Sequence, residues 1–108
     1  MTDLNLKENP TLGDFQEYAK KMVKERGFEN ETILEQCLLL GEEVGELFKA
    51  IRKESTNISI DKQSQFGDIG HEMADIMMYL FCLANNLEID LEKAWREKEE
   101  INKKRKWD

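Results

Sequence analysis

In the stretch LLLGEEVGELFKAI, residues 38–51, acidic residues lie inside an apolar helical pattern. Its leucines, Val44, Phe48 and Ile51 recur at spacings of three and four, the period of a helix face. A capping-box pair, Thr32 and Glu35, precedes the stretch. We therefore predict one long helix from Thr32 to about Lys53, and the number of apolar residues around it predicts a central position in the fold.

Two pairs of carboxylates occupy helix positions that would normally hold core side chains. Glu43 and Glu46 share a face in the first stretch, and Glu72 and Asp75 share a face in the second, which begins HEMAD at residue 71. If the two helices pack antiparallel, all four carboxylates face each other. Because carboxylates repel at close range, such a group must be protonated or bound to cations. The pattern predicts a divalent metal site between two helices.

The remaining sequence predicts three more helices and no strand, so the fold class is all-α, with a four-helix bundle-like arrangement. Capping signals place predicted helices at 11–27 and from Asp90 onward, and an apolar stripe places another at about 68–86. Residues 54–67 are predicted to form a polar loop. Residues 1–10 are predicted to be a polar leader and residues 11–108 a single domain. One proline and six glycines argue against a turn-rich β fold.

Composition narrows the classes of function. A net charge of −7 argues against nonspecific nucleic-acid binding, which needs a basic surface. No apolar run is long enough to span a bilayer and no signal-peptide pattern opens the chain, so a cytoplasmic location is expected. Cys37 and Cys82 lie in apolar helical runs without CxxC spacing, which predicts buried free thiols and gives no zinc signal.

An all-oxygen ligand set suits hard cations, so Mg²⁺ is the expected ion, with Mn²⁺ second. The sequence lacks the DxDxDG loop of an EF-hand. Its single histidine, His71, precedes Glu72 instead of following it by three positions, which disfavours a ferritin-like di-iron centre. The main alternative is that the acids are a solvated surface. The repetition of EExxE and ExxD within apolar helices argues against it.

The pattern EExxE…ExxD on two neighbouring helices resembles the MazG-like family of all-α nucleoside triphosphate pyrophosphohydrolases. The resemblance runs from about Leu12 to Trp107 and is densest in residues 38–51, in HEMADIMMYLFCLANNLEIDLEKA (residues 71–94) and in KEEINKKRKW (residues 98–107). It implies Mg²⁺-dependent hydrolysis of (d)NTPs to a monophosphate and pyrophosphate. The chain is also similar to the dCTP pyrophosphatase branch of the family.

The resemblance also implies roles for single residues. Those matching the metal ligands are Glu43, Glu46, Glu72 and Asp75. Glu42 matches a position that is acidic in many members, and either Glu42 or a metal ligand with a free oxygen would accept the proton of the attacking water. Residues matching substrate contacts are Tyr79, Lys98, Asn102 and Arg105. Spacings of four and three independently predict one shared face for the last three, which could equally be an ordinary solvated face.

The positions that hold the base in dCTP-preferring relatives differ here. Ala19 and Phe28 stand at two of them and Arg52-Lys53 near the third, so only Phe28 offers an aromatic ring for stacking. The preferred base therefore stays open. Single-domain relatives form dimers or tetramers, and the many apolar positions agree with a homo-oligomer. The alternative to an enzyme is a non-catalytic helical module that senses nucleotides or binds a protein partner.

Overall fold

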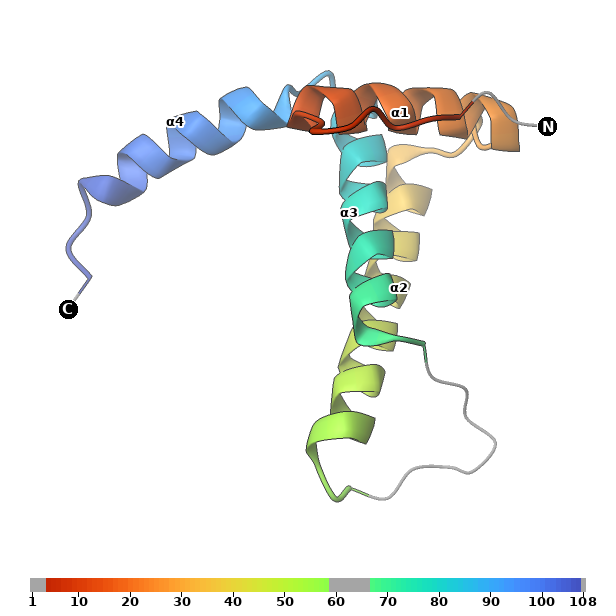
Figure 1. Cartoon of the computed structure of the whole chain (residues 1–108), viewed down its shortest axis with the longest axis vertical. Helices are drawn as coiled ribbons and strands as arrows, with labels where there is room; N and C mark the ends of the chain where they lie inside the picture. Colours follow the sequence, from red (N-terminus) through yellow and green to blue (C-terminus); the bar gives the residue numbers. More distant parts are fainter. Residues whose placement is uncertain (1–3, 59–66, 108) are drawn as a thin grey trace. The chain divides into compact units, whose positions relative to one another are not determined.

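The computed structural model describes residues 4–58 and 67–107 of the chain. These residues form four helices and no strand: α1 (Leu12–Arg26), α2 (Ile33–Ser55), α3 (Ile69–Asn86) and α4 (Leu91–Lys103) (Figure 1). The predicted all-α class and the order of the helices are confirmed. Over the described segments, every helix is too short or too polar to cross a membrane.

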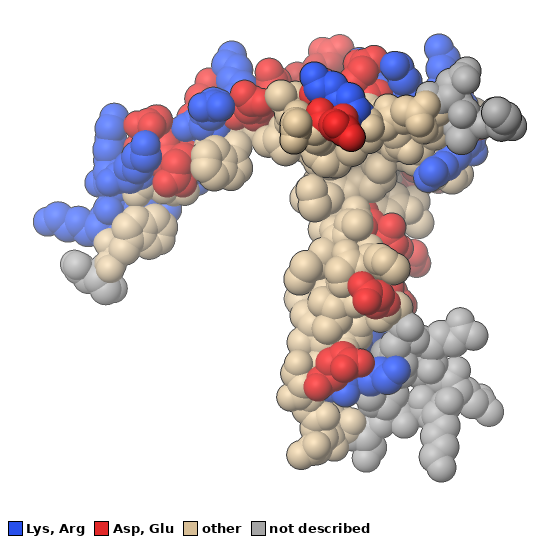
Figure 2. All heavy atoms as spheres, viewed as in Figure 1, with Lys and Arg blue, Asp and Glu red and all other residues tan. Residues whose placement is uncertain are grey.

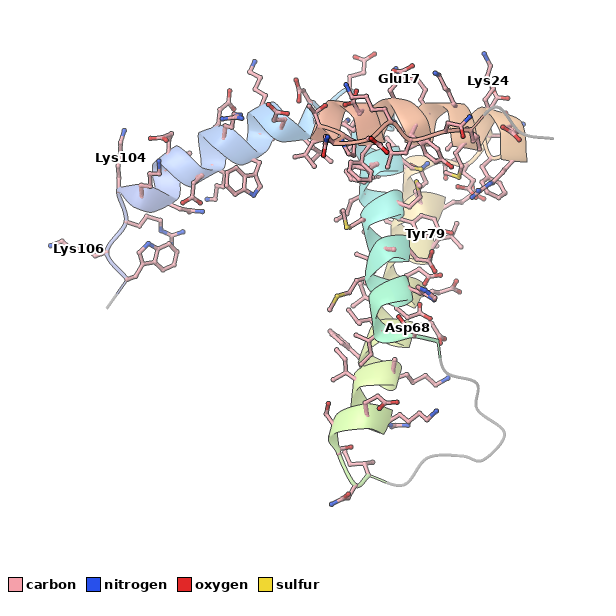
Figure 3. The ribbon with its side chains drawn as sticks, in the orientation of Figure 1. Glu17, Lys24, Asp68, Tyr79, Lys104 and Lys106 are labelled. Carbon is pink, nitrogen blue, oxygen red and sulfur yellow. The ribbon has the colours of Figure 1, made fainter. Side chains whose placement is uncertain are left out.

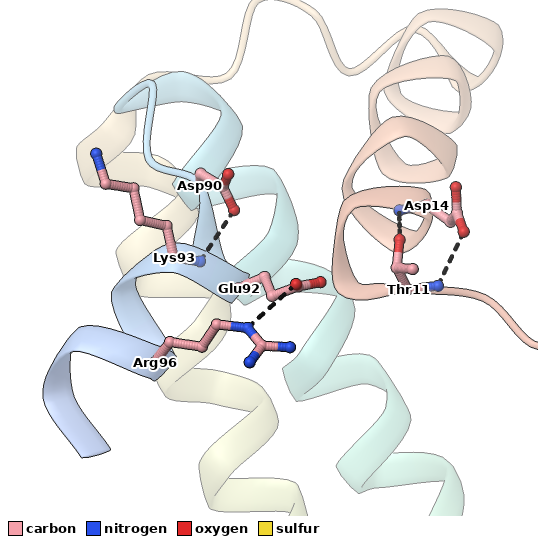
Figure 4. Close-up of polar contacts among 6 residues, drawn as sticks. All are labelled: Thr11, Asp14, Asp90, Glu92, Lys93 and Arg96. Carbon is pink, nitrogen blue, oxygen red and sulfur yellow. Dashed lines mark hydrogen bonds and ion pairs between the residues drawn. The ribbon is translucent and has the colours of Figure 1, made fainter. Parts of the chain in front are cut away.

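Helices α1 and α2 both begin with a complete capping box, as predicted. In α1 the Thr11 hydroxyl accepts a hydrogen bond from the Asp14 amide at 3.1 Å, and the Thr11 amide donates to the Asp14 carboxylate at 2.8 Å (Figure 4). Thr32 and Glu35 make the same pair of bonds at the start of α2. Each box satisfies two backbone donors that a helix start would leave unpaired.

The ends of the helices are set by equally local chemistry. Gly27 ends α1 in the left-handed conformation, with φ 76°, and the Phe28 amide donates to the Val23 carbonyl at 2.9 Å. Asp90 caps α4 as predicted, accepting from the Lys93 amide at 3.2 Å (Figure 4). Helix α4 ends at Lys103, so the prediction that Arg105 shares its face is wrong.

The chain divides into two compact units. The first comprises Met1–Asn30 and Phe81–Asp108, which bring together α1, the last turns of α3 and α4. Gln16, with 9% of its surface exposed, joins all three. Its amide nitrogen donates to Asn85 Oδ1 at 3.0 Å and to the Ile89 carbonyl at 2.8 Å, and its oxygen accepts from the Leu91 amide at 2.9 Å. The buried Gln16 side chain is therefore well paired, with both its amide nitrogen and its oxygen in hydrogen bonds.

An apolar core accompanies this polar network in the first unit. The Phe15 and Phe81 rings stack with centroids 5.3 Å apart. The buried apolar residues of the unit are Ala19, Met22, Phe81, Cys82 and Ala84. The prediction of a buried thiol is confirmed for Cys82 and wrong for Cys37, which is exposed on α2.

The second unit, Glu31–Leu80, contains α2 and the first part of α3, which run side by side in opposite directions (Figure 1). Here Ala50 is the one buried apolar residue among those described. Leu34, Leu38 and Phe48 on α2 are 68%, 63% and 64% exposed. The prediction that α2 is central is therefore wrong for the single chain. Figure 2 shows this unit as mainly uncharged surface with a few acidic and basic side chains, whereas charged side chains of both signs crowd α4.

Candidate metal centre

The start of α3 fixes the backbone beneath two of the predicted ligands. The Asp68 carboxylate accepts a hydrogen bond from the His71 amide at 3.0 Å, and the Asp68 carbonyl accepts from the Glu72 amide at 3.0 Å. Asp68 thus caps α3, and Glu72 lies in its first turn (Figure 3). The positive end of the helix dipole favours a carboxylate at this position.

Three of the four predicted metal ligands come together between α2 and α3. Glu43 from α2, with Glu72 and Asp75 from α3, each place one carboxylate oxygen within 4.8 Å of the other two. Glu72 and Asp75 are three positions apart, so both project from one face of α3 toward Glu43. The antiparallel pairing inferred from the sequence therefore produces a cluster of acidic oxygens.

This cluster changes the acidity of Glu43. The pKa of Glu43 is raised to about 7 from its ordinary value of 4.5, and burial is the largest cause. A hydrogen bond with Glu72 and the negative charges of Asp75, Glu72 and Glu46 contribute to this rise in the same direction. The protein thus holds a carboxylate where its charge is disfavoured unless a proton or a cation is present.

The donor set fits a divalent ion. Carboxylate oxygens are hard ligands, and three of them on two helices leave room for water and substrate oxygens in the coordination sphere of an octahedral cation. A bound cation would also remove the electrostatic conflict that raises the Glu43 pKa. The described residues that would hold the ion are Glu43, Glu72 and Asp75.

The two other acids of the EExxE motif lie outside this three-oxygen cluster. Glu46 is half-buried and close enough for its charge to act on Glu43. One helical turn separates it from Glu43, so it remains on the face that borders the cluster. Glu42 is exposed. Glu42 therefore differs from its neighbour Glu43, which takes part in the cluster.

The predicted aromatic contacts lie in different units. Tyr79 is half-buried on α3, one turn beyond Asp75 (Figure 3). It therefore shares the helix face of the acidic cluster within the second unit. Phe28 belongs to the first unit, where it follows the Gly27 turn and is 42% exposed.

The predicted phosphate contacts all belong to the first unit. Lys98 is exposed on α4, and Asn102 lies one turn further along the same face, half-buried. Among the described residues the Asn102 Oδ1 atom is buried without a hydrogen-bond partner. Arg105 lies beyond the helix, with its guanidinium carbon 5.0 Å from the centre of the Trp107 ring. The Trp107 indole N–H donates to the Asn102 carbonyl at 3.0 Å.

One family model matches most of the chain. The family model described as the MazG nucleotide pyrophosphohydrolase domain matches residues 28–106, which is well over half of the chain and includes all four predicted metal ligands. A search of curated proteins gave no significant match to the chain. The match over residues 28–106 shows that the chain belongs to the MazG nucleotide pyrophosphohydrolase domain family.

Proposed function

We propose that this chain is a Mg²⁺-dependent pyrophosphohydrolase of the cytoplasmic nucleotide pool, with Mn²⁺ as a substitute ion. It would cleave a (d)NTP between the α and β phosphates, giving (d)NMP and pyrophosphate. Members of the MazG family are generally nucleotide pyrophosphohydrolases that use a divalent metal. The observation that supports this function most directly is the approach of the Glu43, Glu72 and Asp75 oxygens within 4.8 Å.

The acidic residues supply the chemistry. A divalent ion at this cluster would neutralise charge on the phosphates and lower the pKa of a bound water. Glu43, Glu72 and Asp75 would hold the ion, and Glu46 would complete the ligand set from the adjacent turn. Glu42 would accept the proton as the water oxygen bonds to phosphorus and the bond to pyrophosphate breaks. This assignment suits Glu42 because it is exposed and lies next to the cluster in sequence.

The substrate contacts follow the family resemblance. Lys98, Asn102 and Arg105 are assigned to the phosphates, since a cation and an amide donor can neutralise and orient a polyphosphate. Asn102 would contact a phosphate through its amide nitrogen, because its Oδ1 atom, like the phosphate oxygens, only accepts hydrogen bonds. Tyr79 and Phe28 are assigned to the nucleoside, by stacking or edge contact.

A product assay tests the reaction. The protein is incubated with each (d)NTP and Mg²⁺, and the products are separated by ion-exchange chromatography. We expect monophosphate and pyrophosphate in equal amounts, with loss of turnover in Glu43→Gln and none in Glu17→Gln, which neutralises an exposed glutamate of α1. Diphosphate and orthophosphate would contradict the cleavage site. Metal binding without turnover of any nucleotide would favour the non-catalytic module.

We also propose that the chain is a homodimer or homotetramer. Helix α2 has one exposed face, made of Leu34, Leu38, Gly41, Gly45 and Phe48. These residues follow one another at spacings of four, three, four and three, so they lie on the same side of the helix. A Cβ atom built on Gly41 or Gly45 meets no described atom within 4 Å, so both glycines are open. Small residues between large apolar ones let another helix approach closely, and a second copy of this face is the proposed partner.

Light scattering coupled to size-exclusion chromatography tests this assembly. We expect a mass of two or four chains for the wild type and a lower mass for Phe48→Glu, which would bury a charge in the interface. Leu6→Glu changes another exposed leucine outside this face and should keep the wild-type mass. A wild-type protein that remains monomeric at high micromolar concentration would contradict the assembly.

A further inference from the structure

We propose that Gly67 is a positioning residue of the metal centre, because its missing side chain leaves the space into which the Glu72 carboxylate folds back. Gly67 stands directly before Asp68, the residue that caps α3. The inference rests on the proposed metal-dependent function and adds a residue outside the acidic motifs. Gly67 itself would touch neither metal nor substrate and would act through Glu72.

The geometry around Gly67 is specific. A Cβ atom built on Gly67 would lie 2.9 Å from Glu72 Cδ and 3.4 Å from Cγ, and it would overlap Glu72 Oε1. Carbon atoms that are not bonded normally approach to about 3.5–4.0 Å. The Glu72 carboxylate, which lies within 4.8 Å of Glu43 and Asp75 oxygens, therefore occupies the space that any larger residue 67 would fill.

The requirement for glycine here concerns space and not backbone conformation. Among the glycines described, Gly27 is the one with positive φ. Gly67 therefore has a backbone that other residues can adopt, and alanine there would not strain the chain. The atom displaced would be the end of a flexible side chain, so α3 would remain intact while Glu72 Oε1 moved away from its present position.

Metal binding measures this displacement directly. Isothermal titration with Mn²⁺ and Mg²⁺ alone, without nucleotide, compares the wild type with Gly67→Ala. Loss of an outer partner of a metal ligand typically weakens affinity about 10- to 100-fold, and we expect a loss in that range. The matched control is Gly13→Ala in α1, where a Cβ would lie at an ordinary 3.6 Å from Thr11 Oγ1. Thermal unfolding in EDTA should give Gly67→Ala and Gly13→Ala similar melting temperatures.

Two variants of Glu72, each combined with Gly67→Ala, test whether Gly67→Ala acts through Glu72 or through a general effect on the structure. Once Glu72→Gln has removed the ligand charge, Gly67→Ala should cause no further loss of affinity. Glu72→Asp, whose carboxylate is one methylene shorter, should reduce the effect of Gly67→Ala. Wild-type affinity in Gly67→Ala, an equal loss in the Glu72→Gln background, or unfolding of Gly67→Ala alone would overturn the role of Gly67. If the wild type binds neither ion, the metal centre itself is wrong.

Discussion

The polar groups of the two compact units differ in how well they are paired. In the first unit Gln16 satisfies three partners at once, and aromatic rings stack beside it. In the second unit Glu43, Glu72 and Asp75 place like charges together, and large apolar side chains of α2 remain exposed. The first arrangement lowers the energy of the folded chain by itself. On the proposed function and assembly, a cation and another surface against α2 would complete the second.

Stability and function therefore depend on different polar groups in this chain. A buried amide that makes all its hydrogen bonds rigidifies its surroundings. A carboxylate whose pKa is raised to about 7 stores unfavourable interactions that a ligand can relieve. Removing Gln16 and removing the clustered carboxylates should therefore have effects of opposite sign on the stability of the metal-free protein.

The largest expected effect is on catalysis. Glu43→Gln combined with Asp75→Asn removes two of the three clustered carboxylates, and we expect (d)NTP hydrolysis to fall at least about 100-fold. Melting in EDTA at pH 8 should show equal or greater stability than the wild type, because the repulsion within the cluster is gone. A large loss of stability in the metal-free double variant would break the comparison, since it would make the acids structural.

Gln16→Ala should have the converse effect. It leaves the Leu91 amide and the Ile89 carbonyl without their partner, and an unpaired buried polar group costs about 1–3 kcal/mol. Urea unfolding followed by circular dichroism measures the loss. Glu17→Ala, at the adjacent exposed position, should change stability little. Metal affinity of the folded Gln16→Ala protein should match the wild type, and a large drop there would show that the two units are coupled.

The two capping boxes give one matched substitution in each unit. Thr11→Ala and Thr32→Ala each remove a hydroxyl that accepts a helix-start amide, which costs about 1 kcal/mol. Hydrogen exchange monitored by NMR would show where that loss appears. Equal effects on all protected amides in both variants indicate one cooperative unfolding unit. Effects confined to α1 in one variant and α2 in the other would sharpen the division into units.

The smallest expected effect is a dependence of stability on pH in EDTA. The pKa of Glu43 is higher in the folded state than in the unfolded state. The stabilising contribution of Glu43 to the free energy of unfolding is therefore fully present below pH 4.5 and is lost as pH rises through about 7. The metal-free wild type should melt a few degrees lower at pH 8 than at pH 5, and Glu43→Gln should reduce that difference. Added Mg²⁺ should reverse the trend, because it binds the deprotonated cluster. A pH profile of Glu43→Gln identical to that of the wild type would remove Glu43 as its source.

The local chemistry of the sequence predicted the helices well. Capping signals predict helix starts at Thr11, Thr32 and Asp90, and apolar spacing predicts one near Asp68. The structure places each of these four residues directly before a helix. The capping signals depend on side chains bonding to amides three residues away, so they need no knowledge of the rest of the fold. The exception is Arg105: a charged run continues the helical pattern past Lys103, and nothing in that pattern predicts the turn that carries Trp107 back to the Asn102 carbonyl.

The sequence likewise predicts one part of the candidate site and not the other. The helical period predicted that Glu43 would meet Glu72 and Asp75, because spacing alone determines which residues share a helix face. Spacing could not predict that Glu46 would stay outside the three-oxygen cluster, nor that Gly67 would lie against Glu72, since both depend on how two helices approach each other. Exposure of Cys37 and Leu38 was missed for a related reason, because apolar composition does not distinguish a core from an interface.

The contrast between the two cysteines provides one chemical reporter in each unit. Cys37 is exposed on α2, whereas Cys82 is buried in the first unit beside the aromatic stack. Thiol reagents react with accessible thiolates, so a brief pulse of iodoacetamide would alkylate Cys37 in the native protein and leave Cys82 unmodified until its unit opens. Mass spectrometry of the two cysteine-containing peptides would then report two events in one sample. Alkylation of Cys82 would report the opening of the first unit, and protection of Cys37 would report the covering of α2 in an assembly.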